Sequence, residues 1–162
     1  MPLAVPDHVL TLPREQLTEF FLVFARFEFA LKVSGYAKDG PWGSEVDWKT
    51  FAESIGAQLF AADSIELAGA INYLEGHPAR RQAYADSGTP WLDRPAPKSY
   101  SRTRALLFYV QGVRNNLVHG NKFIMKETPD VPERDLHLLR SATAVLSAVL
   151  ELSPATAQAF FE

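Results

Sequence analysis

Apolar residues recur every three or four positions over much of the chain, a period that predicts amphipathic α-helices. The longest such stretch covers residues 13–36, where Pro13 suits the start of a helix and Gly35 suits its end. One face carries Phe20, Phe24, Phe27 and Leu31, and the roughly opposite face carries Leu22, Phe29 and Val33. A helix that is apolar on two sides must be covered on two sides. We therefore expect it either at the centre of a large core or between the core and a subunit interface.

Capping residues and stop signals predict further helices. Asp47 caps a helix over residues 47–60, and Asp63 or Ser64 begins another that ends near Gly76. A later helix begins at Ser99 or Ser101 and runs to about His119, with a buried stripe of Leu106, Val110, Val113 and Leu117. A long helix from about Pro132 to Leu152 has an inner face of Leu136, Leu139, Thr143, Leu146 and Leu150. A short helix over residues 155–161 can follow.

Strand signals are weak, because no series of alternating apolar and polar runs is joined by a hairpin dipeptide. Residues 38–45 are predicted to form a loop. Residues 85–99 are predicted to form a longer one, either a lid or binding segment or a connector anchored by Trp91. With 162 residues, 47% of them apolar, the chain is expected to fold as one domain over 1–162, with a core over about 14–152. The predicted class is all-α, an antiparallel bundle of four or more helices.

Several function classes are excluded by what the sequence lacks. It has no cysteine, so disulfides, thiolate metal sites and cysteine nucleophiles are absent. It has no His-x-x-x-His pair, no Gly-x-Ser-x-Gly and no glycine-rich phosphate or dinucleotide fingerprint, so we expect no metal and no cofactor. No stretch approaches about 18 uncharged apolar residues, and the first ten residues do not resemble a signal peptide. We therefore expect a cytoplasmic protein with no membrane partner.

The basic residues are concentrated in one segment, although the net charge is −3. Residues 94–126 have seven lysines and arginines and no acid, whereas 1–93 and 127–162 have net charges of −6 and −4. The seven are Arg94, Lys98, Arg102, Arg104, Arg114, Lys122 and Lys126. A local basic patch on an acidic body indicates one anion-binding site rather than general nucleic-acid binding. The alternative is a solvated helix face whose charges are balanced by acids elsewhere in the fold.

Candidate chemistry is concentrated in Arg114, Asn115 and His119, late in the basic helix. Helix geometry puts Asn115 and His119 on one face, with Arg114 rotated by about 100°. Arginine can bind phosphate through two donors, and histidine transfers protons near neutral pH. Together they could cleave RNA without a metal, leaving a 2′,3′-cyclic phosphate and a 5′-hydroxyl. The alternative is a chance combination, in which Arg114 forms an ion pair and His119 caps the helix.

Other side chains could support such a site. Candidates for binding substrate are Asn116, Arg104, Lys122, Arg80 and Arg81. Asn116 could instead be a turn former, and the pair of arginines could complement a helix C-terminus. Glu28 lies beside the aromatic face of the first helix and needs a partner, for which Arg114 is a candidate. Otherwise Glu28 is exposed or pairs with Lys32 one turn away.

The sequence resembles the HEPN superfamily at this motif, an arginine, four to six residues and a histidine, with a polar residue directly after the arginine. Here four residues separate Arg114 from His119, and Asn115 fills the polar position. The long aromatic helix FFLVFARFEFALKVSG upstream is also similar to those domains, so the resemblance covers about residues 14–152. It implies a helical bundle that dimerises, so that two motifs face one cleft, with Arg114, Asn115 and His119 as the site. Some HEPN-like sites also include an acid from an early helix.

The resemblance implies a metal-independent endoribonuclease that acts on RNA as a homodimer, in a toxin, defence or RNA-processing role. His119 would be the general acid or base, Arg114 would bind the scissile phosphate, and Asn115 would position either of them. The alternative is a non-catalytic dimeric module of the same fold that binds a nucleotide, RNA or a protein partner. A third interpretation is a toxin that a separately encoded minimal nucleotidyltransferase silences as its antitoxin.

Overall fold

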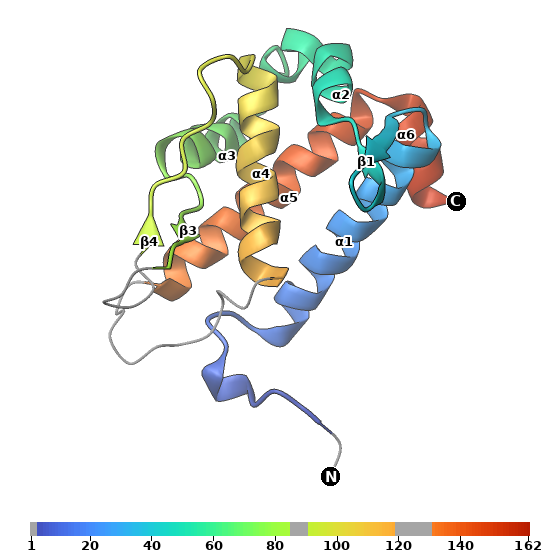
Figure 1. The fold of residues 1–162 in the computed structure, drawn as a ribbon. Helices are drawn as coiled ribbons and strands as arrows, with labels where there is room; N and C mark the ends of the chain where they lie inside the picture. Colours follow the sequence, from blue (N-terminus) through green and yellow to red (C-terminus); the bar gives the residue numbers. More distant parts are fainter. Residues whose placement is uncertain (1–2, 85–90, 119–130) are drawn as a thin grey trace.

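The computed structural model describes residues 3–84, 91–118 and 131–162, and this part of the chain is mostly helical, as predicted (Figure 1). The α-helices are α1 (Arg14–Val33), α2 (Trp48–Ile55), α3 (Ile65–Gly76), α4 (Arg102–Val118), α5 (Val131–Glu151) and α6 (Pro154–Phe161). Two 3₁₀ helices are η1 (Asp7–Val9) and η2 (Gly56–Phe60). The strands are β1 (Ala37–Gly40), β2 (Gly43–Val46), β3 (Arg81–Gln82) and β4 (Trp91–Leu92).

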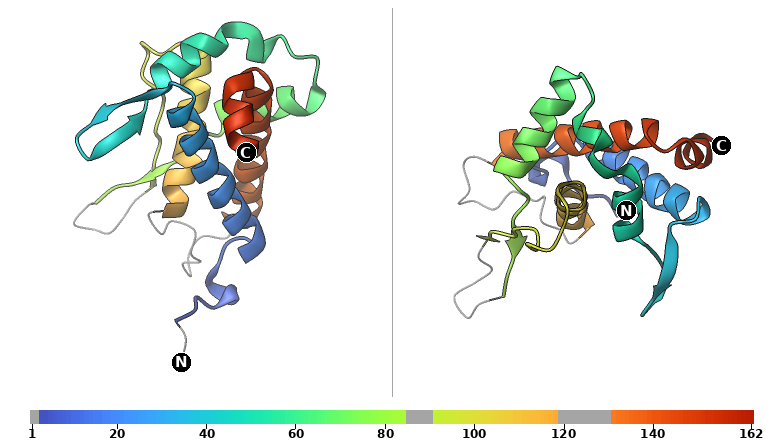
Figure 2. Two further views of the ribbon diagram at one scale, coloured as in Figure 1. Left: turned by 90° about the vertical axis from the view of Figure 1, so that its right-hand side faces the viewer. Right: turned by 90° about the horizontal axis from the view of Figure 1, so that it is seen from above.

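Helix α4 lies at the centre of the fold, where it contacts α1, α2, α3 and α5 (Figures 1 and 2). It descends in Figure 1, whereas α1 and α5 rise obliquely, and α5 crosses it at a large angle (Figures 1 and 2). Helix α3 packs along α5, and α6 folds back against α1. The largest fully buried side chains come from helices α1 to α5 and from η2: Phe24, Phe27, Leu31, Phe51, Ile55, Leu59, Leu74, Leu106, Leu107, Val110, Leu138 and Leu146.

The predicted helix boundaries follow from their caps. The side chain of Asp47 accepts a hydrogen bond from the backbone N–H of Thr50 (3.2 Å) at the start of α2. Ser64, rather than Asp63, caps α3, and Ser101, rather than Ser99, accepts from Arg104 at the start of α4. These bonds satisfy backbone donors that the first turn of a helix leaves unpaired. The expected end of α1 is also confirmed, because Gly35 takes a positive φ of 100°.

Three local predictions are wrong. The expected loop over 38–45 is instead a hairpin, in which β1 and β2 pair antiparallel from Ala37 opposite Val46 to Gly40 opposite Gly43. The expected helix over 47–60 breaks at Gly56, whose φ is 56°, and continues as η2. In the expected loop over 85–99, residues 91–92 form β4 and pair with β3, whereas residues 85–90 lie outside the described part of the chain. The pairing of β4 with β3 joins segments on either side of that gap.

The aromatic face of α1 and the apolar stripe of α4 are buried as predicted, although Leu117 is only partly covered. On α5, Leu139, Leu146 and Leu150 are buried as predicted and Leu136 is partly buried, but Thr143 is exposed. The buried side of α5 also includes Leu138, Ala142, Val145 and Val149. The second apolar face of α1 is uncovered in the single chain. Leu22, Phe29 and Val33 are 57%, 48% and 58% exposed. The cover that this face requires is therefore not supplied by the described residues of one protomer.

Arg26 joins α1 to the C-terminal helix. Its Nε and Nη2 donate to the carbonyl oxygens of Phe160 and Ala159, both at 2.9 Å. These carbonyls belong to the last turn of α6, and the last turn of a helix leaves its carbonyl oxygens without partners inside the helix. The same guanidinium lies over the ring of Phe29, 5.0 Å from its centroid. Position 26 thus contacts both α6 and the uncovered apolar face of α1.

Within the described residues, no single helix has the length and hydropathy of a membrane span. Only α5 from Glu133 onward and α6 satisfy that test together, across a bend of 113°.

Candidate functional site

The centre of the candidate site is an ion pair between α1 and α4. Nη2 of Arg114 donates a hydrogen bond to Oε2 of Glu28 at 3.0 Å. Their side chains are 32% and 26% exposed, so solvent reaches the pair but does not surround it. Of the partners considered for Glu28, the structure therefore selects Arg114 rather than Lys32. A carboxylate beside the aromatic face of α1 is compensated by a charge from the neighbouring helix.

Two further contacts hold the Arg114 guanidinium. Its Nη1 donates to Oδ1 of Asn115 at 3.0 Å, and its Cζ lies 5.4 Å from the centroid of the buried Phe24 ring. A guanidinium has five N–H donors, and the two bonds to Asn115 and Glu28 use two of them. Three therefore have no protein acceptor among the described residues. Arg114 is oriented by its neighbours and still has donors for an external anion.

His119 and Lys122 lie outside the described residues, which end in this region at Val118 and resume at Val131. Their expected roles, as general acid or base and as substrate contact, stay predictions. Asn115, which would share a helix face with His119, is half-buried near the last described turn of α4. The described part of the motif therefore consists of Arg114, Asn115 and Asn116.

Asn116 faces away from the Glu28–Arg114 pair. Its side chain is buried, and its Nδ2 donates to the carbonyl oxygen of Arg80 at 2.9 Å. This bond fixes the segment before β3 against α4, on the opposite side of α4 from α1 (Figure 1). The structure thus gives Asn116 a structural contact, and its expected contact with substrate stays a prediction.

Arg80, Arg81 and Arg104 are not gathered around Arg114. The Nε of Arg80 donates to Asp93 at 3.1 Å in an exposed ion pair, and Arg81 is exposed on β3. Arg104 lies ten positions before Arg114, about 15 Å along the same helix. Burial lowers the pKa of the Arg104 guanidinium, and its Nη1 is covered without a hydrogen-bond partner in the described structure. The candidate cations therefore do not form one cluster around Arg114.

The N-terminal half of α4 carries a feature that sequence reasoning missed. Arg104 lies over the ring of Tyr100 and Arg94 over the ring of Phe108, each with 4.6 Å from Cζ to centroid. The two rings meet edge to face at 5.9 Å. We call these four residues the basic–aromatic surface. The spacing of Tyr100, Arg104 and Phe108, four residues apart, is the signal that could have found it.

The basic–aromatic surface and the Arg114 pair are linked along one helix face. At 100° per residue, Arg104, Phe108, Gln111 and Asn115 lie within about 60° of one another. This stripe extends over about 16 Å. It begins at the basic–aromatic surface and ends beside Arg114. Cations and aromatic rings on one track are the combination that single-stranded nucleic acids contact through phosphates and bases.

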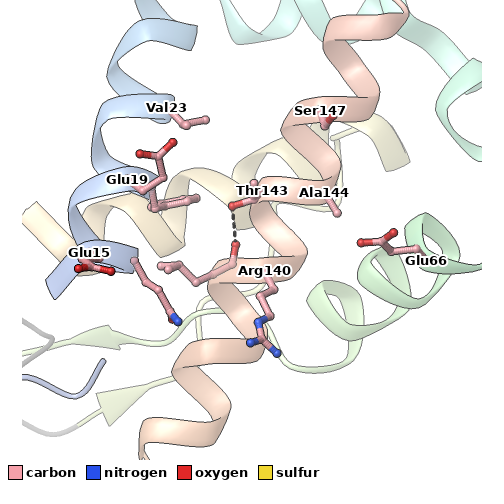
Figure 3. Close-up of a pocket in the computed structure, with 11 residues that line it drawn as sticks. Glu15, Glu19, Val23, Glu66, Arg140, Thr143, Ala144 and Ser147 are labelled. Atoms are coloured by element: carbon pink, nitrogen blue, oxygen red, sulfur yellow. Dashed lines mark hydrogen bonds between the residues drawn. The ribbon is translucent and has the colours of Figure 1, made fainter. Parts of the chain in front are cut away.

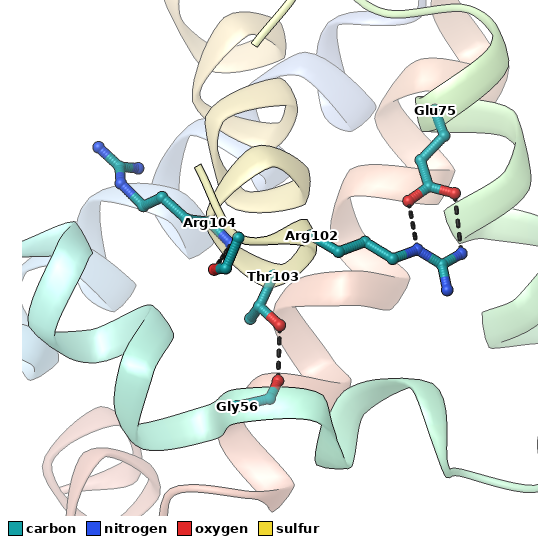
Figure 4. A network of polar contacts seen from close by, with 6 residues as sticks. Gly56, Glu75, Arg102, Thr103 and Arg104 are labelled. Carbon is teal, nitrogen blue, oxygen red and sulfur yellow. Dashed lines mark hydrogen bonds and ion pairs between the residues drawn. The ribbon is translucent and has the colours of Figure 1, made fainter. Parts of the chain in front are cut away.

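Other parts of the basic segment are balanced by acids, as the alternative interpretation of the charge pattern expected. Nε and Nη2 of Arg102 donate to the two carboxylate oxygens of Glu75 at 2.8 and 2.9 Å (Figure 4). The neighbouring Thr103 donates to the carbonyl oxygen of Gly56, which ties α4 to η2. Arg104 projects from the other side of α4 in the same view. Arg102 thus stabilises the fold, whereas Arg94, Lys98 and Arg104 have no acid partner among the described residues.

No cluster of three or more histidine or acidic side chains suited to a metal ion occurs in the described part of the chain. The described site therefore offers hydrogen-bond donors, one balanced ion pair and aromatic faces. Comparisons of the chain with protein-family models, with curated proteins and with solved structures find no match.

Proposed function

We propose that the chain is a HEPN-like endoribonuclease that cleaves RNA without a metal. The observation that carries this proposal is the Arg114 guanidinium, which Glu28, Asn115 and Phe24 hold in place while three of its donors lack an acceptor among the described residues. A guanidinium fixed in this way can bind phosphate oxygens without first losing the freedom of a long side chain. In this proposal Glu28 is a positioning residue, because it acts through Arg114.

The proposed reaction is an intramolecular transesterification. The ribose 2′-oxygen forms a bond to phosphorus, the bond from phosphorus to the 5′-oxygen breaks, and the 2′-proton passes to a base. A proton from an acid neutralises the leaving 5′-oxygen. His119 would serve as the base or the acid, and Arg114 would stabilise the charge that develops on the phosphoryl oxygens. The products are a 2′,3′-cyclic phosphate and a 5′-hydroxyl.

A homodimer is part of the proposal. Glu28 offsets the charge of Arg114, so a single copy of the pair attracts a phosphate only weakly. Two copies that share a cleft would supply two guanidinium groups and two histidines to one phosphodiester. The uncovered apolar face of α1 (Leu22, Phe29, Val33) supports such an association, because it flanks Glu28 on the same helix and is exposed in the single chain.

The test is cleavage of end-labelled RNA in buffer with EDTA. We expect the wild-type protein to cut, and His119→Ala and Arg114→Ala each to reduce the rate by at least about a hundredfold. Lys98→Ala is the matched control, because Lys98 is exposed in the same basic segment but distant from Arg114. Product analysis should find cyclic phosphate ends. Absence of cleavage by the wild type, or equal cleavage by His119→Ala, would refute the nuclease.

A second candidate is a non-catalytic module of the same fold that binds RNA or a nucleotide. The observation that favours it is the structural use of several expected site residues: Arg114 is paired with Glu28, Asn116 holds Arg80, and Arg80 pairs with Asp93. This candidate predicts RNA binding without cleavage. The third interpretation is a toxin that a minimal nucleotidyltransferase silences. It predicts that expression of the chain alone arrests growth and that Arg114→Ala relieves the arrest.

A further inference from the structure

An open groove of about 770 Å³ runs between α1 and α5 and continues over α5 toward the start of α3 (Figure 3). Its floor is apolar where Phe20 and Val23 of α1 face Leu139 of α5. Farther along α5 the floor consists of small side chains: Thr143, Ala144 and Ser147. Small residues let another backbone approach closely, and the adjoining apolar side chains offer surface to bury. This groove is distinct from the Glu28–Arg114 pair, none of whose residues lines it.

Carboxylates stand on both walls of the groove. Glu15 and Glu19 project from α1, and Glu66 projects from α3 across α5 (Figure 3). None of the three forms an ion pair within the described chain, and neither does Arg140, the one base in the lining. The lining therefore has three acids and one base, and no ion pair among the described residues offsets this local excess of negative charge.

Gln16 adds an unsatisfied acceptor to the same lining. Its Oε1 is covered by protein atoms and accepts no hydrogen bond in the described structure. A covered polar atom without a hydrogen-bond partner is unfavourable, because it has lost its contact with water and gained nothing in return. Rotation of the amide toward the groove would let a bound donor reach this oxygen. The groove thus offers apolar area, negative charge on two sides and an acceptor.

We propose that this groove binds a basic amphipathic helix of a partner protein. Apolar side chains spaced three and four residues apart on that helix would cover the floor, and lysines or arginines on its two flanks would meet Glu15 and Glu19 on one side and Glu66 on the other. The part of α5 that forms the floor, residues 139–147, is about 12 Å long, so a helix of three or four turns would cover it. This interaction is independent of the proposed ribonuclease activity.

The probe for this surface is a pair of designed 16-residue helical peptides. Both carry leucines three and four residues apart; one has lysines on its flanks and the other has glutamates at the same positions. We expect the lysine peptide to bind the full-length protein at least tenfold more tightly than the glutamate peptide, by fluorescence anisotropy. Its affinity should fall as salt is added, because the attraction between exposed charges is screened. Equal binding of the two peptides, or no binding of either, would overturn the proposal.

Protein variants locate the interaction. A triple variant with Glu15→Lys, Glu19→Lys and Glu66→Lys should bind the lysine peptide at least tenfold more weakly than the wild type does. The same variant should bind the glutamate peptide more tightly. Glu53→Lys is the matched control, because this exposed glutamate lies on α2 outside the groove. Ser147→Trp should fill the groove and block binding, while circular dichroism verifies that each variant is folded. The inference fails if the three charge reversals leave the affinities of both peptides unchanged. It also fails if the wild-type protein sediments as a dimer that Ser147→Trp converts into a monomer, because the groove is then covered by a second copy.

Discussion

Glu28 on α1 and Arg114 on α4 lie 86 positions apart in the sequence and meet through a 3.0 Å hydrogen bond between a carboxylate and a guanidinium. The contact joins the helix with the aromatic core face to the helix with the candidate motif. It also explains why a carboxylate is tolerated beside Phe24 and Phe27, since a partner of opposite charge compensates it. The same guanidinium is the group that we propose for phosphate binding, so in this proposal one side chain contributes to both stability and function.

The first prediction concerns this coupling. Glu28→Ala should lower the free energy of unfolding by about 1 kcal/mol, because it leaves Arg114 half-buried without its acid. In the Glu28→Ala background, Arg114→Ala should lower the free energy of unfolding by less than it does in the wild type. The difference, which is the interaction energy of the pair, should be about 0.5–1 kcal/mol after allowance for solvent screening. Urea denaturation of the four proteins in the cycle measures both values. Strictly additive losses would show that the pair contributes nothing to the fold.

The second prediction concerns the outer face of α1. Phe29→Glu should convert a homodimer into a monomer, since it places a charge in an apolar interface. Because Phe29 is about half exposed in the single chain, the variant should stay folded. Trp42→Glu, on the exposed tip between β1 and β2, is the matched control and should stay dimeric. Sedimentation at tens of micromolar protein measures the oligomeric state of each variant. A monomeric wild type would contradict the proposal that two copies of Arg114 share one cleft.

The third prediction concerns the basic–aromatic surface. Arg104→Ala should weaken binding of a single-stranded 2′-O-methyl RNA about fivefold, and the slope of log affinity against log salt should fall by about 0.7. This RNA lacks the attacking hydroxyl, so binding is measured without cleavage. Lys49→Ala on α2 is the control, because Lys49 is exposed on another helix and is not one of the four residues of the basic–aromatic surface. If neither the affinity nor the salt slope changes, the basic–aromatic surface does not contact the RNA.

The fourth prediction concerns pH and the cap of α2. Hydrogen bonds from the side chain and the backbone of Thr50 lower the pKa of Asp47 below its ordinary value of 3.8. A lowered folded-state pKa adds stability above the ordinary pKa, and this stability is lost as the pH falls through the folded-state value. Asp47→Ala should therefore lower the free energy of unfolding by about 1 kcal/mol at pH 7, and by progressively less below pH 3.8.

Asp47→Asn separates the cap from the charge, because an amide also caps a helix but does not titrate in this range. It should keep most of the stability at pH 7 and lose the dependence on pH. Thermal denaturation between pH 2 and pH 7 measures all three proteins. A constant difference between wild type and Asp47→Ala over that range would mean that the carboxylate charge is not involved.

Local signals predicted the helices well, because caps and apolar periods act within one or two turns. Asp47, Ser64 and Ser101 each begin a helix as expected, and Gly35 ends α1. The hairpin formed by β1 and β2 was missed because its strands have no apolar face: apart from Val46, its residues are exposed or half-exposed. Its register depends on a tight turn between Gly40 and Gly43 rather than on alternation.

The candidate site was predictable only in part, since helix periodicity gives the face of a residue but not the neighbour that the face meets. The motif identified Arg114 and Asn115, and Glu28 could be proposed as a partner because a carboxylate beside aromatic rings requires one. The burial of Asn116 against Arg80 and the exposure of Thr143 on α5 depend on how the helices are packed together. These contacts are tertiary, and no local pattern encodes them.

The double contact of Arg26 gives this position an unusual constraint. One planar group both ends α6, through the carbonyls of Ala159 and Phe160, and shields part of the ring of Phe29. Lysine could retain the charge but could not donate to both carbonyls in the same plane. Residue 26 and the last turn of α6 are therefore expected to change together as related sequences diverge, and a substitution of Phe29 is expected to alter the contact of Arg26 with α6.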